Sequence, residues 1–549
     1  MKRRLATLAF CLASPLAVWA QMGRTTDWWT FAADAQRSGW EKNEQRFTRE
    51  DVKNFRSLWE MKLPFSKTGP RVISAPVILG NLIGSRGFKE LAFLESAAGD
   101  LWSIDVDLAQ KYWEVHPDAA QLKGLPASCS AFATVPNLPA PVVFRFTRPV
   151  GAAPAGAPSP STPAPPIAAP SPSSQSPSTP PVTEQRRDAV APSGANPAPP
   201  AQGPPPEPPS PPSSTLNAMF RVRPVYMIDA AGQLRQVNLD DASQLHPPRE
   251  FLASGMKAAS LNLADNTIYA VAESCKGAKD ASVYALDLML PQAKPNVFAT
   301  QAAGVSAIAN PAIGANGVLY VQTGKGQCDP AAGKYGNALL ALTPKELKIK
   351  DYFTLESNSA PVAFTYKGRE LVAAAGADKR IYLLDTNSLG GENHKTPLFQ
   401  SDVLGSFSGG LSTWEQPDGT RYLLAAIAGK YASNANGSIV CFKLQEDSGK
   451  LTLAPLWTSP DLLSPEPPVI AQGVVFALAD GKFKGKKPDS SSHATLYALD
   501  GITGEVLWTS GNQVKTPGNL SGLTIANARL YFTTVDNVLH VFGKYLATE

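Results

Sequence analysis

The stretch LYALDGITGEVLW, residues 496–508, decides the fold of this chain. From Leu496 onward its residues alternate as those of a pleated β-strand do. Asp500, Thr503 and Gly504 then supply turn chemistry, because oxygen-bearing side chains hydrogen-bond the local backbone and glycine adopts positive φ without strain. The closing Val-Leu-Trp resumes an extended apolar run. The stretch therefore predicts a strand, a tight turn and a second strand.

Weaker copies of this stretch recur along the chain, and several of them end their first strand on an aspartate. With a proline-rich insert set aside, the copies lie roughly 40 to 70 residues apart, which is the period of a four-stranded propeller blade. Eight copies predict an all-β, eight-bladed β-propeller of antiparallel blades, and the weak copy at 232–243 leaves seven blades as the alternative. Because an aspartate recurs at the same place, we interpret it as a turn-forming residue and not a catalytic one: Asp105, Asp287, Asp385 and Asp500.

The two ends of the chain complement each other. The last copy, VLHVFGK at 538–544, has no outer strand after it. The segment SLWEMKLP at 57–64 has the form of that missing strand, and its Trp59 matches Trp113 and Trp508 in the other copies. We therefore expect the N-terminal strand to complete the C-terminal blade and to close the ring.

Composition divides the chain into four parts. Residues 1–20 carry a basic start, an apolar run and a small residue at the end, which is typical of a signal peptide; the alternative, a membrane anchor, would need a longer run. Residues 149–214 are rich in Pro, Ala and Ser and contain no aromatic residue, so we expect a disordered surface insert. Residues 21–148 and 215–549 are then parts of one propeller. The protein should be periplasmic or secreted.

Charge and cysteine content exclude several classes of function. The net charge of +4 is small, and no dense Lys/Arg stripe indicates nucleic-acid binding. No later apolar run is long enough to span a membrane, and we expect a monomer. There is no CxxC motif for zinc or redox chemistry. Cys275 and Cys328 follow equivalent strands of consecutive copies, so we predict a disulfide between them, whereas Cys441 lies inside a strand and should be a buried thiol.

These copies resemble the pyrroloquinoline-quinone-type propeller repeat, whose hallmark is a Tyr-Ala-Leu-Asp-like strand followed by Thr-Gly and a Trp. The opening DWWTFAADAQRSGWEKNE at 27–44 is similar to the start of quinoprotein-like chains. The resemblance implies that the tryptophan of each outer strand docks onto the neighbouring blade, with its indole N–H on a carbonyl. In this chain the docking tryptophans would be Trp59, Trp113, Trp457 and Trp508.

The resemblance permits two functions. The family includes quinone-dependent alcohol and sugar dehydrogenases, which hold pyrroloquinoline quinone (PQQ) and usually calcium at the propeller axis. This chain has no adjacent cysteine pair, and no set of acid, arginine and calcium ligands falls at motif positions, so catalytic and cofactor residues stay unassigned. Related repeats also occur in propellers without a cofactor. We expect a non-catalytic scaffold that binds a protein, peptide or glycan and holds no metal. The alternative is a periplasmic PQQ- and calcium-dependent alcohol or sugar dehydrogenase.

Overall fold

The computed structural model describes residues 26–65, 73–84, 87–96, 98–116, 134–136, 224–229, 231–253, 255–274, 281–301, 311–357, 359–481 and 492–545. The predicted signal peptide (1–20), the predicted insert (149–214) and Cys275 lie outside the described residues, so these predictions stay predictions. Contacts divide the chain into a unit made of 1–145 and 222–549 and a second unit of 146–221. Everything below concerns the first unit.

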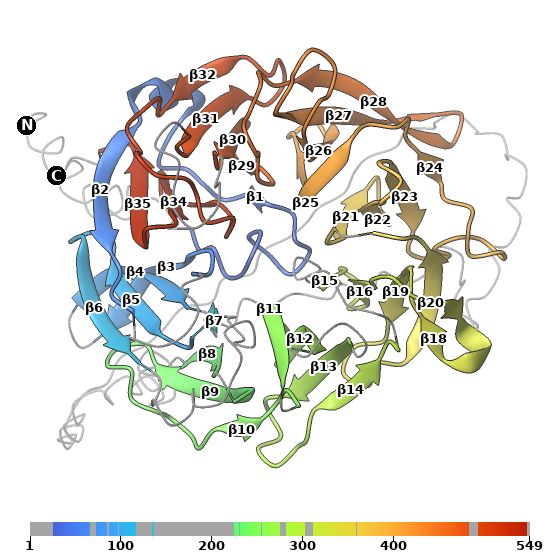
Figure 1. Cartoon of the computed structure of the whole chain (residues 1–549), viewed down its shortest axis with the longest axis horizontal. Helices are drawn as coiled ribbons and strands as arrows, with labels where there is room; N and C mark the ends of the chain where they lie inside the picture. Colours follow the sequence, from blue (N-terminus) through green and yellow to red (C-terminus); the bar gives the residue numbers. More distant parts are fainter. Residues whose placement is uncertain are drawn as a thin grey trace, which may run out of the picture. The chain divides into compact units, whose positions relative to one another are not determined.

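The described residues form eight antiparallel sheets, which we number as blades 1 to 8 in chain order (Figure 1). The predicted eight-bladed propeller is confirmed, and the alternative of seven blades is wrong. Blade 1 consists of β3 (Val77–Gly84), β4 (Gly87–Glu95), β5 (Leu101–Asp105) and β6 (Gln110–Val115), and blade 2 of β7 (Thr134–Pro136), β8 (Pro224–Ile228), β9 (Gln233–Asn238) and β10 (Arg249–Glu250). Blade 3 consists of β11 (Met256–Ala264), β12 (Thr267–Ser274), β13 (Ser282–Asp287) and β14 (Asn296–Ala299), and blade 4 of β15 (Ala312–Ile313), β16 (Leu319–Gln322), β19 (Ala338–Leu342) and β20 (Ile349–Thr354).

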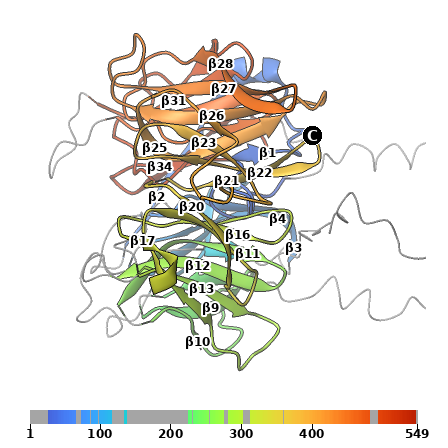
Figure 2. The same ribbon diagram turned by 90° about the vertical axis from the view of Figure 1, so that its right-hand side faces the viewer.

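Blades 5 to 8 follow the same plan, with the innermost strand first in each blade. Blade 5 consists of β21 (Val362–Tyr366), β22 (Arg369–Ala375), β23 (Ile381–Asp385) and β24 (Phe399–Gln400), and blade 6 of β25 (Ser406–Glu415), β26 (Arg421–Ala428), β27 (Gly437–Asp447) and β28 (Lys450–Thr458). Blade 7 consists of β29 (Val469–Ala471), β30 (Val474–Ala479), β31 (Thr495–Asp500) and β32 (Val506–Thr509), and blade 8 of β33 (Thr524–Ala526), β34 (Arg529–Thr533), β35 (Val538–Gly543) and β2 (Arg56–Lys62). Figure 2 shows the same unit from the side.

The middle strands of a blade are buried on both faces, because each sheet packs between two neighbouring sheets. Every residue of β30, VVFALA, and of β19, ALLAL, is buried. This explains why these strands read as continuous apolar runs and not as alternating ones. One core cluster joins Leu339 of blade 4 to Val372 of blade 5, so the hydrophobic core lies between blades.

The N-terminal strand closes the ring as predicted. Strand β2 pairs antiparallel with β35, and Trp59 lies opposite Val541 while Lys62 lies opposite Val538. Figure 1 shows the blue β2 beside the red β35. The backbone N–H of Leu63 extends the pairing by donating to the carbonyl of Asn537 at 2.8 Å. Chain ends that lie far apart in sequence therefore share one blade.

Three minor elements complete the unit. A 3-10 helix, η1 (Arg49–Asn54), begins after a capping box of Thr48 and Asp51. A small hairpin of β17 (Cys328–Asp329) and β18 (Lys334–Tyr335) encloses η2 (Pro330–Ala332). Strand β1 (Trp40–Glu41) was not predicted, and it pairs in parallel with β29 on the axial side of blade 7. None of the helices in the described ranges has the length and apolarity needed to cross a membrane.

Candidate functional site

The four repeated aspartates occupy one structural position, at the end of the third strand of a blade. In each of them Oδ1 accepts a backbone N–H two or three residues further on, from Leu108, Met289, Asn387 and both Ile502 and Thr503. Their second oxygen, Oδ2, pairs with a cation in every case. The pairs are Asp105 with Lys89, Asp287 with Lys345, Asp385 with Arg369 and Asp500 with Arg49. Both oxygens are therefore occupied by structural partners.

The tryptophans of the outer strands lie against the following blade. Trp113 donates its indole N–H to the carbonyl of Leu239 at 2.7 Å, and Trp457 donates to Gly501 at 3.0 Å. Trp508 contacts the ring of Phe542 in blade 8, at 6.0 Å between centroids. Trp59 packs against the core cluster shared by blades 7, 8 and 1. The indole of Trp457 also lies on Gly504, whose φ of +74° places its Cα hydrogens against the ring.

The axis of the propeller is occupied by the chain itself. Residues 26–46, which we call the N-terminal segment, run inside the ring of innermost strands, where Figure 1 shows them as a blue trace. The segment makes backbone hydrogen bonds to innermost strands of five blades, through Ile78 (2.9 Å), Ile313 (2.7 Å), Ala363 (3.1 Å), Thr413 (2.8 Å) and Ile470 (2.8 Å). The sequence predicted that 27–44 begins a quinoprotein-like chain; it gave no indication that the segment fills the axis.

Arg37 is the centre of this segment. Its side chain is 2% exposed, and its guanidinium donates to the carbonyls of Phe31 (2.7 Å), Leu261 (3.1 Å) and Pro311 (3.2 Å). A further N–H donates to the hydroxyl of Thr30 at 2.8 Å. Burial lowers the pKa of Arg37 to about 9, with Asp34 opposing that shift. An arginine with five donors is suited to this position because it can satisfy carbonyls from the segment, blade 3 and the start of blade 4 together.

One axial cavity, lined by described residues alone, is small. A cavity of about 30 Å³ lies between the segment and the innermost strands of blades 5 to 8, lined by Phe31, Arg37 and Leu411 among mainly apolar neighbours. A water molecule needs about 10–15 Å³ measured in this way, whereas small-molecule sites span about 300–1,000 Å³. The axial cavity can therefore hold one or two waters and no organic cofactor.

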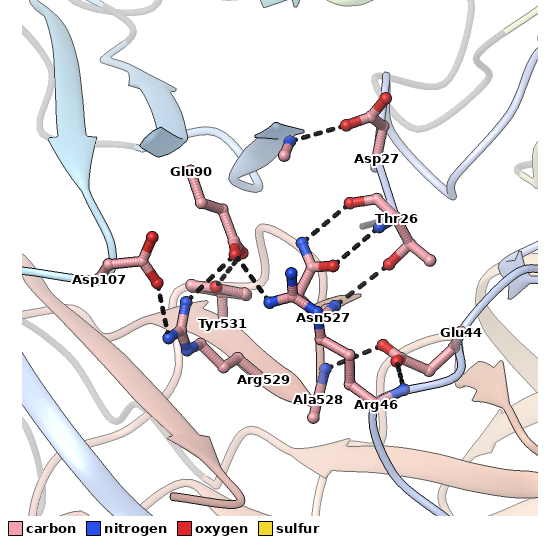
Figure 3. Close-up of polar contacts among 11 residues, drawn as sticks. Thr26, Asp27, Glu44, Arg46, Glu90, Asp107, Asn527, Ala528, Arg529 and Tyr531 are labelled. Carbon is pink, nitrogen blue, oxygen red and sulfur yellow. Dashed lines mark hydrogen bonds and ion pairs between the residues drawn. The ribbon is translucent and has the colours of Figure 1, made fainter. Parts of the chain in front are cut away.

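A polar cluster anchors the segment where blades 8 and 1 meet (Figure 3). Thr26 and Asn527 exchange three hydrogen bonds of 2.7–3.1 Å, and the carboxylate of Glu44 accepts the N–H of Ala528 at 2.8 Å. Beside them the buried Glu90 accepts from the hydroxyl of Tyr531 at 3.2 Å. These bonds connect the start and the end of the segment to the same blade.

Glu90 is the buried acid of that cluster. Burial raises its pKa to about 7, although Arg529 lies 3.3 Å and Arg46 lies 3.7 Å from its Oε2. Arg529 in turn pairs with the half-exposed Asp107 at 2.8 Å. A buried acid with two cations and a tyrosine can be part of an active site. Here every partner of Glu90 lies in the N-terminal segment or in blade 8, where the ring closes on blade 1. We therefore assign the cluster to anchoring the segment.

A larger cavity lies to the side of the segment, between blades 5 and 6. It measures about 250 Å³ and is lined by Gln36, Ser38, Trp40 and Lys42 from the segment, by residues of the two blades and by Ala315 of blade 4. These four residues line one cavity although the chain between them is irregular, because Arg37 and Gly39 have φ of +64° and +66°. We call this space the Trp40 cavity. This cavity could not be predicted from the sequence, because the residues of the segment that line it are mostly polar and no hydrophobic alternation marks a strand.

Comparisons with known proteins show the fold. No protein-family model matches this chain, and no curated protein matches it. Among solved structures, a quinohemoprotein alcohol dehydrogenase from Comamonas testosteroni superposes with a TM-score of 0.53 at 12% sequence identity, covering 97% of this chain and 83% of that one. The quinohemoprotein alcohol dehydrogenase ADHIIG from Pseudomonas putida HK5 gives 0.54 at 10% identity, covering 95% and 81%. At identities this low, the likeness shows that this chain shares their propeller fold and nothing further.

Proposed function

We propose that this chain is an exported, non-catalytic β-propeller that binds a protein, peptide or glycan on one face of its ring. One observation carries the proposal: the N-terminal segment occupies the axis, where a ring of this type has its natural ligand funnel. The innermost strands use their free N–H groups on the segment and not on a ligand. Export to the periplasm or the medium remains part of the proposal and rests on residues 1–20.

The alternative, a PQQ- and calcium-dependent alcohol or sugar dehydrogenase, is suggested by the quinohemoprotein alcohol dehydrogenases that share the fold. The described residues do not fit that cofactor pair at the axis. The axial cavity of about 30 Å³ is far smaller than a tricyclic quinone, and its lining is mainly apolar. Within the described ranges no three His, Cys, Asp or Glu side chains gather so as to hold a metal ion. Likeness of fold at this identity does not transfer an activity.

A reconstitution experiment tests the proposal. The purified mature chain is titrated with PQQ in the presence of calcium, and reduction of an artificial electron acceptor is followed with ethanol and with glucose. We expect no saturable quinone absorbance and no reduction above the rate without protein. A known PQQ alcohol dehydrogenase, stripped and reloaded in the same buffer, provides the positive control. Stoichiometric quinone binding together with substrate-dependent turnover would refute the scaffold proposal.

A further inference from the structure

The Trp40 cavity combines aromatic surface with polar groups at its mouth. Trp40 is half-buried, and the guanidinium of Arg421 lies 5.9 Å from its ring centroid and 5.5 Å from that of Phe364. The exposed Thr365 and the half-buried Gln36 and Glu370 add a hydroxyl, an amide and a carboxylate to the same lining. Such a set presents donors and acceptors side by side around an apolar surface, which is the usual composition of a small-molecule site.

The charges of this cavity are largely neutralised inside the protein. Lys42 pairs with Asp34 at 3.1 Å, and Arg421 pairs with Glu415 while also donating to the carbonyl of Thr365 at 2.9 Å. A phosphate or carboxylate ligand would have to compete with these carboxylates for each cation. The cavity is therefore poorly suited to an anion.

Glu370 is the carboxylate at the mouth. Its Oε1 accepts the backbone N–H of Ala315, and burial raises its pKa. A carboxyl group held in this way can accept a hydrogen bond from a ligand hydroxyl on its second oxygen, and an ionised acceptor makes the stronger bond. The hydroxyl of Thr365 and the amide of Gln36 can each donate or accept. A ligand hydroxyl also both donates and accepts hydrogen bonds, so it can pair with either of these groups.

From this chemistry we infer that the Trp40 cavity is a binding site for one neutral sugar residue, either free or at the end of a glycan. The inference rests on the proposed binding function and specifies its ligand. The volume of about 250 Å³ lies just below the usual range of ligand sites, which limits the occupant to a single ring. The aromatic surface contacts the C–H groups of the sugar, and Glu370, Thr365 and Gln36 bind its hydroxyls.

The test uses the full mature chain and a panel of small probes. Glucose, galactose, mannose and N-acetylglucosamine are the neutral probes, glucuronate and phosphate are the anionic ones, and choline is the cationic one. Binding is followed by tryptophan fluorescence and by saturation-transfer NMR on the ligand. We expect at least one neutral sugar to bind with a Kd on the order of 1 mM. Saturation transfer should be observed at the protons of the sugar ring.

Matched variants locate the site. Glu370→Gln and Thr365→Val should each weaken the neutral sugar about 5- to 10-fold, because each removes or weakens one ligand hydrogen bond. Glu446→Gln and Thr458→Val make the same chemical changes outside the cavity and should leave the Kd unchanged. Thermal unfolding of all four variants checks that they are folded. Glu446 and Thr458 lie in β27 and β28 of blade 6.

Three results would overturn the inference. They are no neutral sugar bound at 50 mM, sugar binding that both cavity variants leave intact, and binding confined to the charged probes. None of these results affects the reconstitution experiment with PQQ. A chain without quinone turnover that also binds no sugar keeps the scaffold proposal and loses only this site.

Discussion

At the scale of single residues, the repeat aspartates show how one side chain can serve two structural purposes. One carboxylate oxygen orders the turn that follows the third strand, and the other pairs with a lysine or arginine from a neighbouring strand, turn or helix. The turn role could be predicted from the sequence, because Asp followed by Thr-Gly is turn chemistry. The cation could not, because it lies at no fixed distance along the chain: Lys89 precedes Asp105, whereas Lys345 follows Asp287.

Gly504 provides the first prediction at this scale. A Cβ on Gly504 would lie 2.7 Å from two carbons of the Trp457 indole, and φ is already +74°. We expect Gly504→Ala to lower the free energy of unfolding by about 2–5 kcal/mol. About 1–2 kcal/mol of this loss comes from placing alanine in a left-handed backbone conformation, and the rest comes from displacing the indole ring. Urea unfolding at constant pH provides the measurement.

A second glycine separates the two contributions. Gly449 has φ of +81° with open space around it. Gly449→Ala should therefore cost only the free energy of placing alanine in a left-handed backbone conformation. The difference between the two variants is the cost of displacing Trp457 from its bond to Gly501. Equal losses in both variants would show that the indole does not depend on Gly504.

At the scale of elements, the N-terminal segment solves a problem common to propellers. The innermost strand of each blade has an edge that faces the axis, and unpaired N–H and C=O groups on an edge need water or a partner. The segment supplies carbonyls to Ile313, Ala363, Thr413 and Ile470 in four different blades. It therefore acts as a shared edge partner and ties opposite sides of the ring together.

Arg37 allows this role to be measured. Arg37→Met would leave the carbonyl of Phe31 without its side-chain donor, while those of Leu261 and Pro311 would keep only the bonds from Thr30 and Asn262. We expect this to cost about 1–3 kcal/mol. Hydrogen exchange should quicken at the amides of Ile313 and Thr413, because the segment that covers them is released.

The amide of Val475, in a buried strand of blade 7, is the internal control for that experiment. Its exchange should follow the global stability and change less than that of the axial amides. Exchange that quickens equally at all three amides would mean that the segment does not open locally. Arg37→Lys keeps the charge but loses the fork of donors, so we expect an intermediate loss of stability.

The sequence predicted those elements whose periodicity repeats and missed the one that does not repeat. The closing strand could be found because Trp59 stands where Trp113 and Trp508 stand in other blades, and β2 pairs with β35 accordingly. Strand β1 and the axial path of 26–46 could not be found, since Gln36, Arg37, Ser38, Glu41 and Lys42 are all polar and show no hydrophobic alternation. The Trp40 cavity depends on that path, so it was missed as well. The sequence indicated Trp40 only as a member of the stretch 27–44, which is similar to the start of quinoprotein-like chains.

At the scale of the whole molecule, buried acids determine how stability depends on pH. Burial, reinforced by nearby Glu44, Asp27 and Asp34, raises the pKa of Glu41 to about 8, and burial raises that of Glu90 to about 7. Between blades 7 and 8, Glu466 and Asp480 are 4% and 2% exposed, and burial raises the pKa of both. Each of these groups is held protonated by the fold at a pH where the unfolded chain would ionise it.

The sign of the effect follows from linkage. A carboxyl whose pKa is raised in the folded state stabilises fully below its unfolded pKa of about 4, and that stability is lost as pH rises through the folded value. For Glu41 the interval from 4.5 to about 8 corresponds to a loss on the order of 5 kcal/mol by pH 8. His540 acts in the opposite sense at the acid end, because burial lowers its pKa and its protonation below about 6.5 destabilises the fold. Because the four acids with raised pKa values outnumber this one histidine, we expect stability to increase as pH falls from 8 toward 5.

Urea unfolding at pH 5.5, 7 and 8.5 tests this expectation. The free energy of unfolding should fall by several kcal/mol between the first and the last pH. Glu41→Gln should remove the share of that slope that belongs to Glu41, because the amide cannot ionise, and leave the share of Glu90, Glu466 and Asp480. Glu505→Gln, at an exposed position of the blade 7 turn, is the matched control and should leave the slope unchanged. Stability that rises toward pH 8.5, or a slope that Glu41→Gln does not alter, would mean that Glu41 is hydrated in the folded chain. The axis would then be more open to water than its 30 Å³ cavity indicates, and the argument against a cofactor at that place would lose its basis.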